Sequence, residues 1–230
     1  MIFMGRETSL VFSMIELVIF DLDGTLLYTL DSITLSTNKV LKKHGLAPLP
    51  KEDIKRYVGD GVIDLLRRAF QASGSDENVD DAIVSEFRAC FKDDCDYKVK
   101  PYNGMNTVLQ YLKNENIKIA CNSNKPDVNA KKIIQKHFDG FFDYVLGNVE
   151  EFPKKPDPSG AIKIMNELNV SANNTLYIGD SDVDVFTARN AGVHCVGAAW
   201  GYRGEEELLN SGAENVIFHP LELIHILKKM

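Results

Sequence analysis

The sequence predicts a doubly wound α/β fold on a mainly parallel sheet, with an inserted all-helical domain. Three observations predict it. Short apolar runs recur along the chain, and segments with apolar residues at helical spacing separate most of them. The interval 28–99 breaks this alternation and contains helical patterns only. Strand and helix in alternation indicate a parallel sheet covered by helices, and the interruption indicates an insertion.

The apolar runs have the form of strands that are buried on both faces of a sheet. The first is ELVIF at 16–20, which stops at Asp21. The others are IKIAC at 117–121, DYVLG at 143–147, TLYIG at 175–179, HCVGAA at 194–199 and NVIF at 215–218. Nearly continuous apolar runs of this length are typical of central parallel strands.

Helical periodicity fills the gaps between these strands. Apolar residues recur three and four positions apart in 105–114, 129–137, 159–168 and 183–190. We therefore expect a Rossmann-like catalytic core made of residues 14–27 and 100–230. Residues 1–13 form a leader whose structure the sequence leaves open.

The interval 28–99 is expected to form a helical cap domain. An amphipathic helix over 34–44 ends at Gly45, and Pro50 is a favourable start for the next helix. Periodic stretches at 62–71 and 79–91 predict two further helices, and PYNG at 101–104 marks the return to the core.

Composition excludes several classes of protein. Apolar residues make up 44% of the chain and charged residues 26%, which is typical of a globular protein. The net charge of −7 and the lack of basic runs argue against nucleic acid as a partner. No stretch is long and apolar enough for a membrane partner, and the four scattered cysteines suggest reduced thiols. A cytoplasmic protein, monomeric or homodimeric, is expected.

Oxygen-bearing side chains follow three of the predicted strands. Asp21 and Asp23 in DLDGT come after the first, NSNK at 122–125 after the second, and GDSDVD at 179–184 after the TLYI run. An isolated D-x-D-G is more often a polar turn. Three segments with oxygen-bearing side chains at one edge of a sheet, however, indicate a ligand site. Lys155, before a proline, could stabilise charge on a phosphoryl group, although a lone lysine is usually solvated.

In this order, DLDGT, the Ser123 segment, KPDP at 155–158 and GDSDVD resemble the four motifs of the haloacid dehalogenase superfamily. The resemblance covers nearly the whole chain from Glu16. The segments VGDGV at 58–62 and WGYR at 200–203 further resemble phosphoglycolate phosphatases. One departure lies at the entry to the cap, where Tyr28-Thr29 replaces the Asp-Ser that these enzymes commonly carry.

The resemblance implies a role for each matching residue. Asp21 would be the nucleophile that forms an aspartyl phosphate, and Asp23 the general acid and base. Ser123 and Lys155 complete the implied catalytic set. The implied phosphate-binding residues are Asp21, Leu22, Ser123, Asn124 and Lys155. The implied Mg²⁺ ligands are Asp21, the Asp23 backbone carbonyl and Asp180, with Asp184 in a supporting role.

The function implied is hydrolysis of a small phosphorylated metabolite, with 2-phosphoglycolate as the expected substrate and Mg²⁺ as cofactor. Dehalogenation is disfavoured because dehalogenases of the superfamily lack the second aspartate of the first motif. An inorganic pyrophosphatase or a broad sugar-phosphate phosphatase stays open, since the core would look the same, and a phosphomutase is a weaker alternative. From other classes, a receiver-like phosphoacceptor module and a catalytically silent scaffold are the alternatives.

Overall fold

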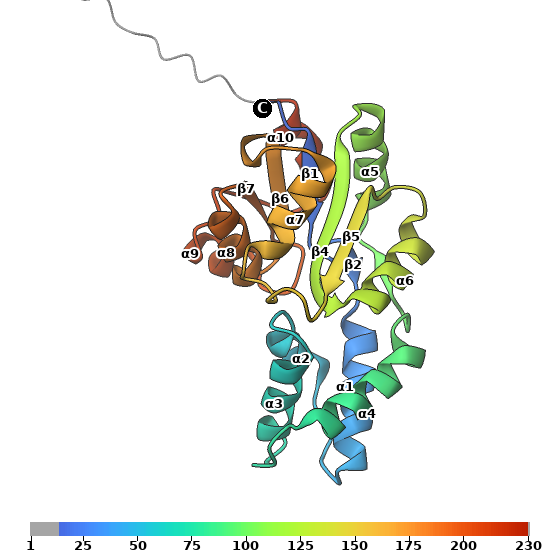
Figure 1. The fold of residues 1–230 in the computed structure, drawn as a ribbon. Helices are drawn as coiled ribbons and strands as arrows, with labels where there is room; N and C mark the ends of the chain where they lie inside the picture. Colours follow the sequence, from blue (N-terminus) through green and yellow to red (C-terminus); the bar gives the residue numbers. More distant parts are fainter. Residues whose placement is uncertain (1–13, 230) are drawn as a thin grey trace, which may run out of the picture.

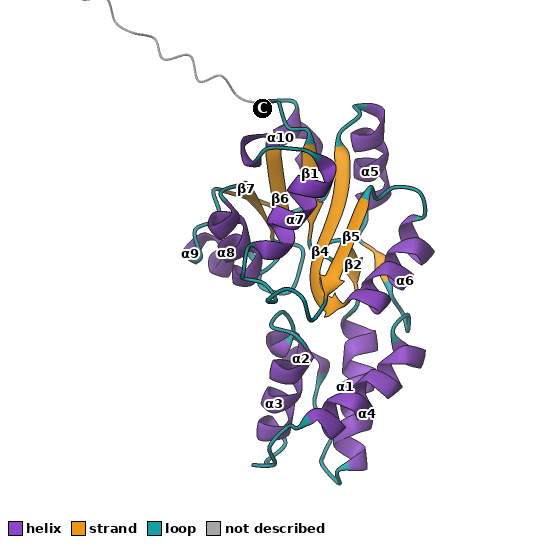
Figure 2. Ribbon diagram, in the orientation of Figure 1, coloured by secondary structure: helices purple, strands orange, loops and turns teal. Residues whose placement is uncertain are grey.

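The structure, a computed structural model, describes residues 14–229 and is built on one parallel sheet (Figures 1 and 2). Its strand order is β5-β4-β1-β6-β7-β8. The bounds are β1 Leu17–Phe20, β4 Lys118–Pro126, β5 Tyr144–Asn148, β6 Thr175–Gly179, β7 His194–Ala198 and β8 Asn215–Ile217. The doubly wound α/β prediction is confirmed, whereas the predicted leader 1–13 lies outside the described residues.

The register of β1 fixes which residues meet at the carboxyl edge of the sheet. Phe20 pairs with Cys121 of β4 on one side and with Ile178 of β6 on the other. Because the three strands are parallel, the residues beyond these pairs, Asp21 among them, lie at the same carboxyl edge of the sheet. The motif segments at the carboxyl ends of β1, β4 and β6 are neighbours for this reason.

Helices cover both faces of the sheet. They are α5 Met105–Asn114, α6 Asp127–Phe138, α7 Ser159–Leu168, α8 Asp182–Ala191, α9 Glu205–Asn210 and α10 Glu222–Leu227. Successive residues of β1 serve opposite layers, as strand geometry requires. Val18 and Phe20 pack in a cluster with residues of α5 and α6, and Leu17 and Ile19 pack in a cluster with residues of α7 and α8.

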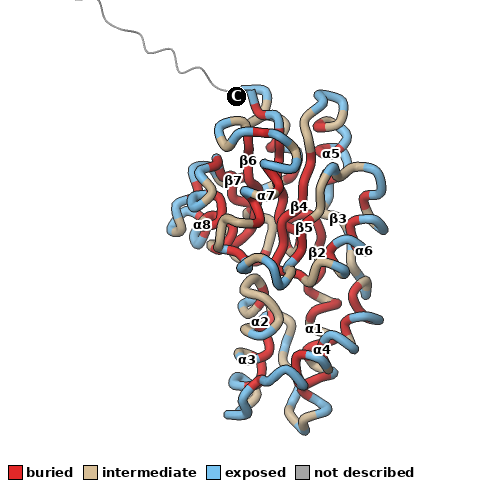
Figure 3. The backbone as a smooth tube through the Cα atoms, in the orientation of Figure 1, coloured by how far each residue is buried: buried red, intermediate tan, exposed pale blue. Residues whose placement is uncertain are grey.

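Residues between β1 and α5 form a second helical body next to the carboxyl edge of the sheet (Figure 1). Its helices are α1 Leu30–Lys43, α2 Lys51–Tyr57, α3 Val62–Ala72 and α4 Asp81–Asp94. They enclose a second hydrophobic cluster, to which Tyr202 of the core also contributes, and their buried segments are red in Figure 3. We call this body the cap, and its assignment to residues 28–99 as a distinct domain stays a prediction.

The cap joins the core through two short strands, β2 Leu27–Tyr28 and β3 Lys100–Pro101, which pair antiparallel. Sequence patterns did not predict them, because two residues are too few to show a period. At the entry to the cap, Thr29 is fully buried, and its backbone N–H donates to the hydroxyl of Tyr202 at 3.1 Å. The departure at Tyr28-Thr29 therefore places a buried polar contact at the junction.

Some boundaries differ from those predicted. The IKIAC strand does not stop at Cys121, because β4 continues irregularly to Pro126 and so includes the polar segment NSNKP. The first cap helix begins at Leu30 rather than at residue 34, and Ser32 donates to the backbone carbonyl of Thr29 in its first turn. In both elements the polar side chains bond to the backbone, so that the apolar pattern in the sequence does not show the full length of the strand or the helix.

Helices α9 and α10 were not predicted as helices, since each has only six residues. Among the helices of residues 14–229, none has the length and apolar character that crossing a bilayer requires.

Candidate active site

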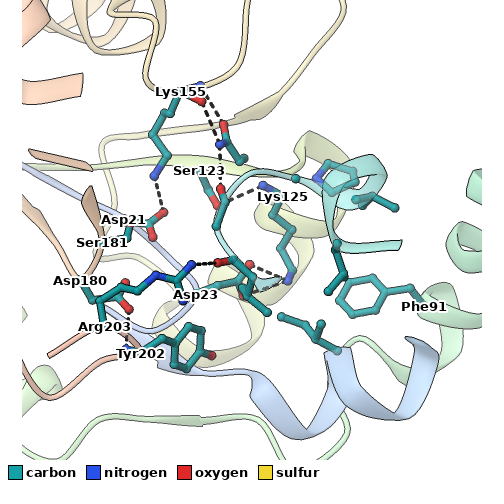
Figure 4. Close-up of a pocket in the computed structure, with 18 of the residues that line it drawn as sticks. Asp21, Asp23, Phe91, Ser123, Lys125, Lys155, Asp180, Ser181, Tyr202 and Arg203 are labelled. Atoms are coloured by element: carbon teal, nitrogen blue, oxygen red, sulfur yellow. Dashed lines mark hydrogen bonds and ion pairs between the residues drawn. The ribbon is translucent and has the colours of Figure 1, made fainter. Parts of the chain in front are cut away.

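The site lies where β1, β4 and β6 end at one edge of the sheet, beneath the cap (Figure 4). Asp21 directly follows β1 and is buried. Leu22 is fully buried, and the phosphate-binding role predicted for it stays a prediction. Ser123 is also buried and, together with Asp21, lines a cavity between core and cap.

Lys155 is the buried cation at the centre of the site. Its Nζ donates to Oδ1 of Asp21 at 2.7 Å and to Oδ1 of Asp184 at 2.7 Å. Asn124 fixes the backbone of the same residue, since its Oδ1 accepts from the Lys155 N–H at 2.8 Å. Lys155 is therefore a positioned charge and not a solvated surface lysine.

Asp180 follows β6 and is held by two donors. The Thr25 hydroxyl donates to its Oδ1 at 3.0 Å, and the Tyr202 backbone N–H donates to its Oδ2 at 2.7 Å. Asp184 sits in the first turn of α8, where its Oδ2 accepts from the Ser181 hydroxyl at 2.8 Å within a capping box. Both carboxylates therefore have fixed orientations.

Asp21, Asp180 and Asp184 form an acidic cluster, since one carboxylate oxygen of each lies within 4.8 Å of the others. Oxygen-only ligands suit a hard divalent cation such as Mg²⁺. Asp184 bonds to Lys155 and Ser181, whereas Asp21 and Asp180 line the cavity, so that these two carboxylates are the ones that can meet an ion there. These residues fit a divalent cation.

Burial dominates the electrostatics of the cluster. It raises the pKa of Asp180 to about 7, and the nearby Asp184 carboxylate adds to this effect. Burial and Asp184 likewise hold the pKa of Asp21 well above its usual range, although Lys155 opposes the shift. Burial alone would lower the pKa of Lys155, but Asp184 and Asp21 outweigh it and raise that pKa.

Asp23 lies apart from the acidic cluster. Both of its carboxylate oxygens accept from Lys125 Nζ, at 2.9 and 3.0 Å. Lys125 is buried, and its Nζ lies 4.6 Å from the ring centroid of Phe91 on α4 (Figure 4). The Asp23 side chain thus faces the pocket on the cap side, while the metal role predicted for its backbone carbonyl stays a prediction.

Three residues with specific contacts were missed from the sequence. Lys125 directly follows the Ser123-Asn124 pair, so that its place in the segment was the available signal. Tyr202 and Arg203 lie in the β7–α9 loop, and Arg203 donates to the backbone carbonyls of Lys55 and Val58 at 2.9 and 2.6 Å. The sequence indicates their segment only through its resemblance to phosphoglycolate phosphatases.

Trp200 serves the core rather than a ligand. Its indole N–H donates to the Thr25 backbone carbonyl at 3.0 Å, and it packs against the core cluster.

Buried acidic residues with a lysine at the carboxyl edge of a parallel sheet, beneath a helical cap, define a hydrolase site of the haloacid dehalogenase type. Residues 18–198 match the model of the haloacid dehalogenase-like hydrolase family, and the chain belongs to this family.

Similar proteins narrow the class further. The chain is 35% identical over 196 residues to a phosphoglycolate phosphatase of Rhodospirillum rubrum, which covers 82% of this chain and 81% of the relative. It is 32% identical over 191 residues to a phosphoglycolate phosphatase of Pseudomonas putida, with 81% and 70% of the two chains covered. The chain is thus a phosphoglycolate phosphatase-like hydrolase.

A solved structure agrees with this placement. A protein of Lactobacillus delbrueckii subsp. bulgaricus, whose assignment as a phosphoglycolate phosphatase is itself a prediction, superposes with a TM-score of 0.87. The two sequences are 27% identical, and the match covers 94% of this chain and 99% of the other. The similarity therefore includes the cap as well as the sheet.

Gly24→Ala should lower activity, because the added methyl group would collide with the carboxylate of Asp180. Gly24 has φ +93°, and a Cβ there would lie 2.3 Å from Oδ2 of Asp180. We expect a loss of activity of roughly a hundredfold, measured as phosphate release, because Asp180 must move. Gly45→Ala is the matched control, since Gly45 has φ +71° and open space around it. It should lose about 1–2 kcal/mol of unfolding free energy and keep its activity.

The stability of the metal-free protein should fall as pH rises. Folding raises the pKa of Asp180 from 3.8 to about 7. The folded state is therefore destabilised as pH rises above 3.8, and the loss of stability is complete above about pH 7. Urea unfolding in EDTA should therefore show a smaller free energy at pH 8 than at pH 5, by on the order of 1–4 kcal/mol. Mg²⁺ should restore more stability at pH 8, and an equal Mg²⁺ effect at both pH values would contradict this.

Proposed function

We propose that the chain is a Mg²⁺-dependent phosphatase that hydrolyses a small phosphomonoester through an aspartyl phosphate on Asp21. The proposed substrate is 2-phosphoglycolate. The observation that carries the proposal is the contact of the buried Lys155 with Asp21 and Asp184, next to Asp180, at the floor of a cavity beneath the cap. A phosphoryl group at this floor would meet a nucleophile and a fixed cation together. The relatives that are phosphoglycolate phosphatases support the choice of substrate.

In the first step an Asp21 carboxylate oxygen attacks phosphorus, and the bond between phosphorus and the ester oxygen breaks. Asp23 gives its proton to the departing oxygen, so that the product leaves as an alcohol. This role for Asp23 is supported by its position, because Asp23 lines the same cavity as Asp21. Lys155 holds the phosphoryl oxygens, on which negative charge collects in the transition state.

In the second step a water attacks the phosphorus of the aspartyl phosphate, and Asp23 accepts its proton. The bond to Asp21 breaks, which releases inorganic phosphate and restores the carboxylate. Ser123 and the backbone of Asn124 and Leu22 would bind the phosphoryl oxygens throughout. A divalent ion held by Asp21, Asp180 and the Asp23 carbonyl would, when bound, offset the negative charge of the carboxylates and the phosphoryl group.

The receiver-like alternative receives less support. Asp21 and Asp23 both follow β1, and the cap covers the cavity that they line. Such enclosure suits turnover of a small molecule, whereas a phosphoacceptor must expose its aspartate to another protein. We further propose that the enzyme acts on a metabolite in the cytoplasm, and the four free cysteines accord with this compartment. The proposed oligomeric state is a monomer or homodimer.

The proposal is tested by phosphate release from 2-phosphoglycolate, pyrophosphate, sugar phosphates and p-nitrophenyl phosphate, each with Mg²⁺ and with EDTA. We expect Mg²⁺-dependent turnover with the highest kcat/KM for 2-phosphoglycolate. Equal slow rates on every compound would reject the assigned substrate and keep the phosphatase. No release from any of them would reject the reaction.

Asp21→Asn should abolish turnover, by at least about 10⁴-fold in kcat, because an amide cannot form the aspartyl phosphate. The variant should still fold, which circular dichroism and urea unfolding measure. Asp76→Asn, at an exposed position in the cap, is the matched control and should keep wild-type rates. Retention of activity in Asp21→Asn would overturn the mechanism.

A further inference from the structure

Lys125 is a buried lysine that the proposed reaction does not use. Its side chain is only 3% exposed, yet its Nζ lines the cavity between Asp23 and Phe91. Burying an ammonium group is costly unless partners compensate it, and here one carboxylate and one aromatic face do so. A residue that only filled space at this position would not need a charge.

The other cations of the cavity have their contacts already. Lys155 bonds to Asp21 and Asp184 at the phosphoryl end. Arg203 donates to two backbone carbonyls of the cap and pairs with Glu207 at 3.0 Å. Lys125 carries three N–H donors, of which Asp23 takes two, so that a third can meet a ligand.

The cap gives the cavity an apolar wall. Among the described residues, each cap residue that lines the cavity is apolar or glycine: Ile33, Val58, Gly59, Gly61, Val62, Leu65, Phe87 and Phe91. Such a wall offers no side-chain hydrogen bonds to the hydroxyls of a sugar. It also lowers the local dielectric, which strengthens the attraction between Lys125 and an anion.

We propose that Lys125 is a specificity-determining residue that binds a second anionic group of the substrate, namely a carboxylate one carbon away from the ester oxygen. This inference rests on the proposed function and deepens it. Lys125 bridges Asp23 and the substrate carboxylate, and it thereby selects phosphorylated 2-hydroxy acids over sugar phosphates and neutral esters.

The geometry favours a short spacing between the two anionic groups. Asp23 must hydrogen-bond the ester oxygen to protonate it, and Lys125 Nζ lies 2.9 Å from Oδ1 of Asp23. A carboxylate two covalent bonds from that ester oxygen therefore falls within reach of the same ammonium group. A more distant charge would point toward the apolar wall of the cap.

The test compares two substrates in one variant. Lys125→Met removes the charge and keeps a long side chain, and both kcat/KM values are measured with Mg²⁺. We expect the ratio of kcat/KM for 2-phosphoglycolate to that for ethyl phosphate, an alkyl ester with an equally demanding leaving group and no carboxylate, to fall by roughly 10- to 100-fold, because a charge-assisted contact is lost with one substrate only. Lys125→Arg should recover most of the ratio.

The matched control is Lys131→Met, which removes an exposed lysine that pairs with Asp127 on α6. Its ratio should equal that of the wild type. If Lys125→Met lowered both kcat/KM values equally, Lys125 would act only through Asp23 and the proposal would fail, while the proposed phosphatase would stand.

A binding experiment separates the two proposals in the other direction. Calorimetry with 3-phosphonopropionate, a phosphonate that cannot be hydrolysed, is compared with propylphosphonate, which lacks the carboxylate. Wild type should bind the first at least tenfold more tightly, and Lys125→Met should bind both alike. This outcome would support Lys125 even if no ester were hydrolysed, and equal wild-type affinities would overturn it.

Discussion

The site depends on one electrostatic constraint, which is the burial of three carboxylates at a single edge of the sheet. Asp21, Asp180 and Asp184 repel one another in a region of low dielectric, and Lys155 is the cation that pairs with two of them, Asp21 and Asp184. The sheet register brings the three together, and the Thr25, Ser181 and Tyr202 donors keep them in place. Such an arrangement costs stability in isolation, and the cost is reduced whenever a cation or a charged ligand is bound.

Much of the core could be predicted from the sequence because strands buried on both faces leave a simple apolar signature. β1 and β6 end where their apolar runs end, and each is followed by its motif aspartates. The pattern failed where local polar contacts decide the structure. β4 extends through NSNKP, since Asn124 and Lys125 find buried partners there that composition does not reveal.

The residues of the candidate site likewise fall into those that the sequence predicts and those that only the structure shows. The resemblance picks out the residues that are expected to handle a phosphoryl group, and Asp21, Ser123, Lys155 and Asp180 all line one cavity in the structure. Residues that discriminate among substrates are harder to predict, because they depend on how cap and core face each other. The contact between Lys125 and Phe91 joins β4 to α4, which lie in different bodies and far apart in sequence.

The β7–α9 loop ties the cap to the core through consecutive residues. Tyr202 holds Asp180 through its backbone and Thr29 through its hydroxyl, and Arg203 binds carbonyls at the end of α2. The cap is therefore not an independent module that evolution could exchange freely. A chimaera that received the cap of a relative would contain helices that fit a different β7–α9 loop. Residues 202–203 would have to be exchanged together with the cap for the cap and the core to remain compatible.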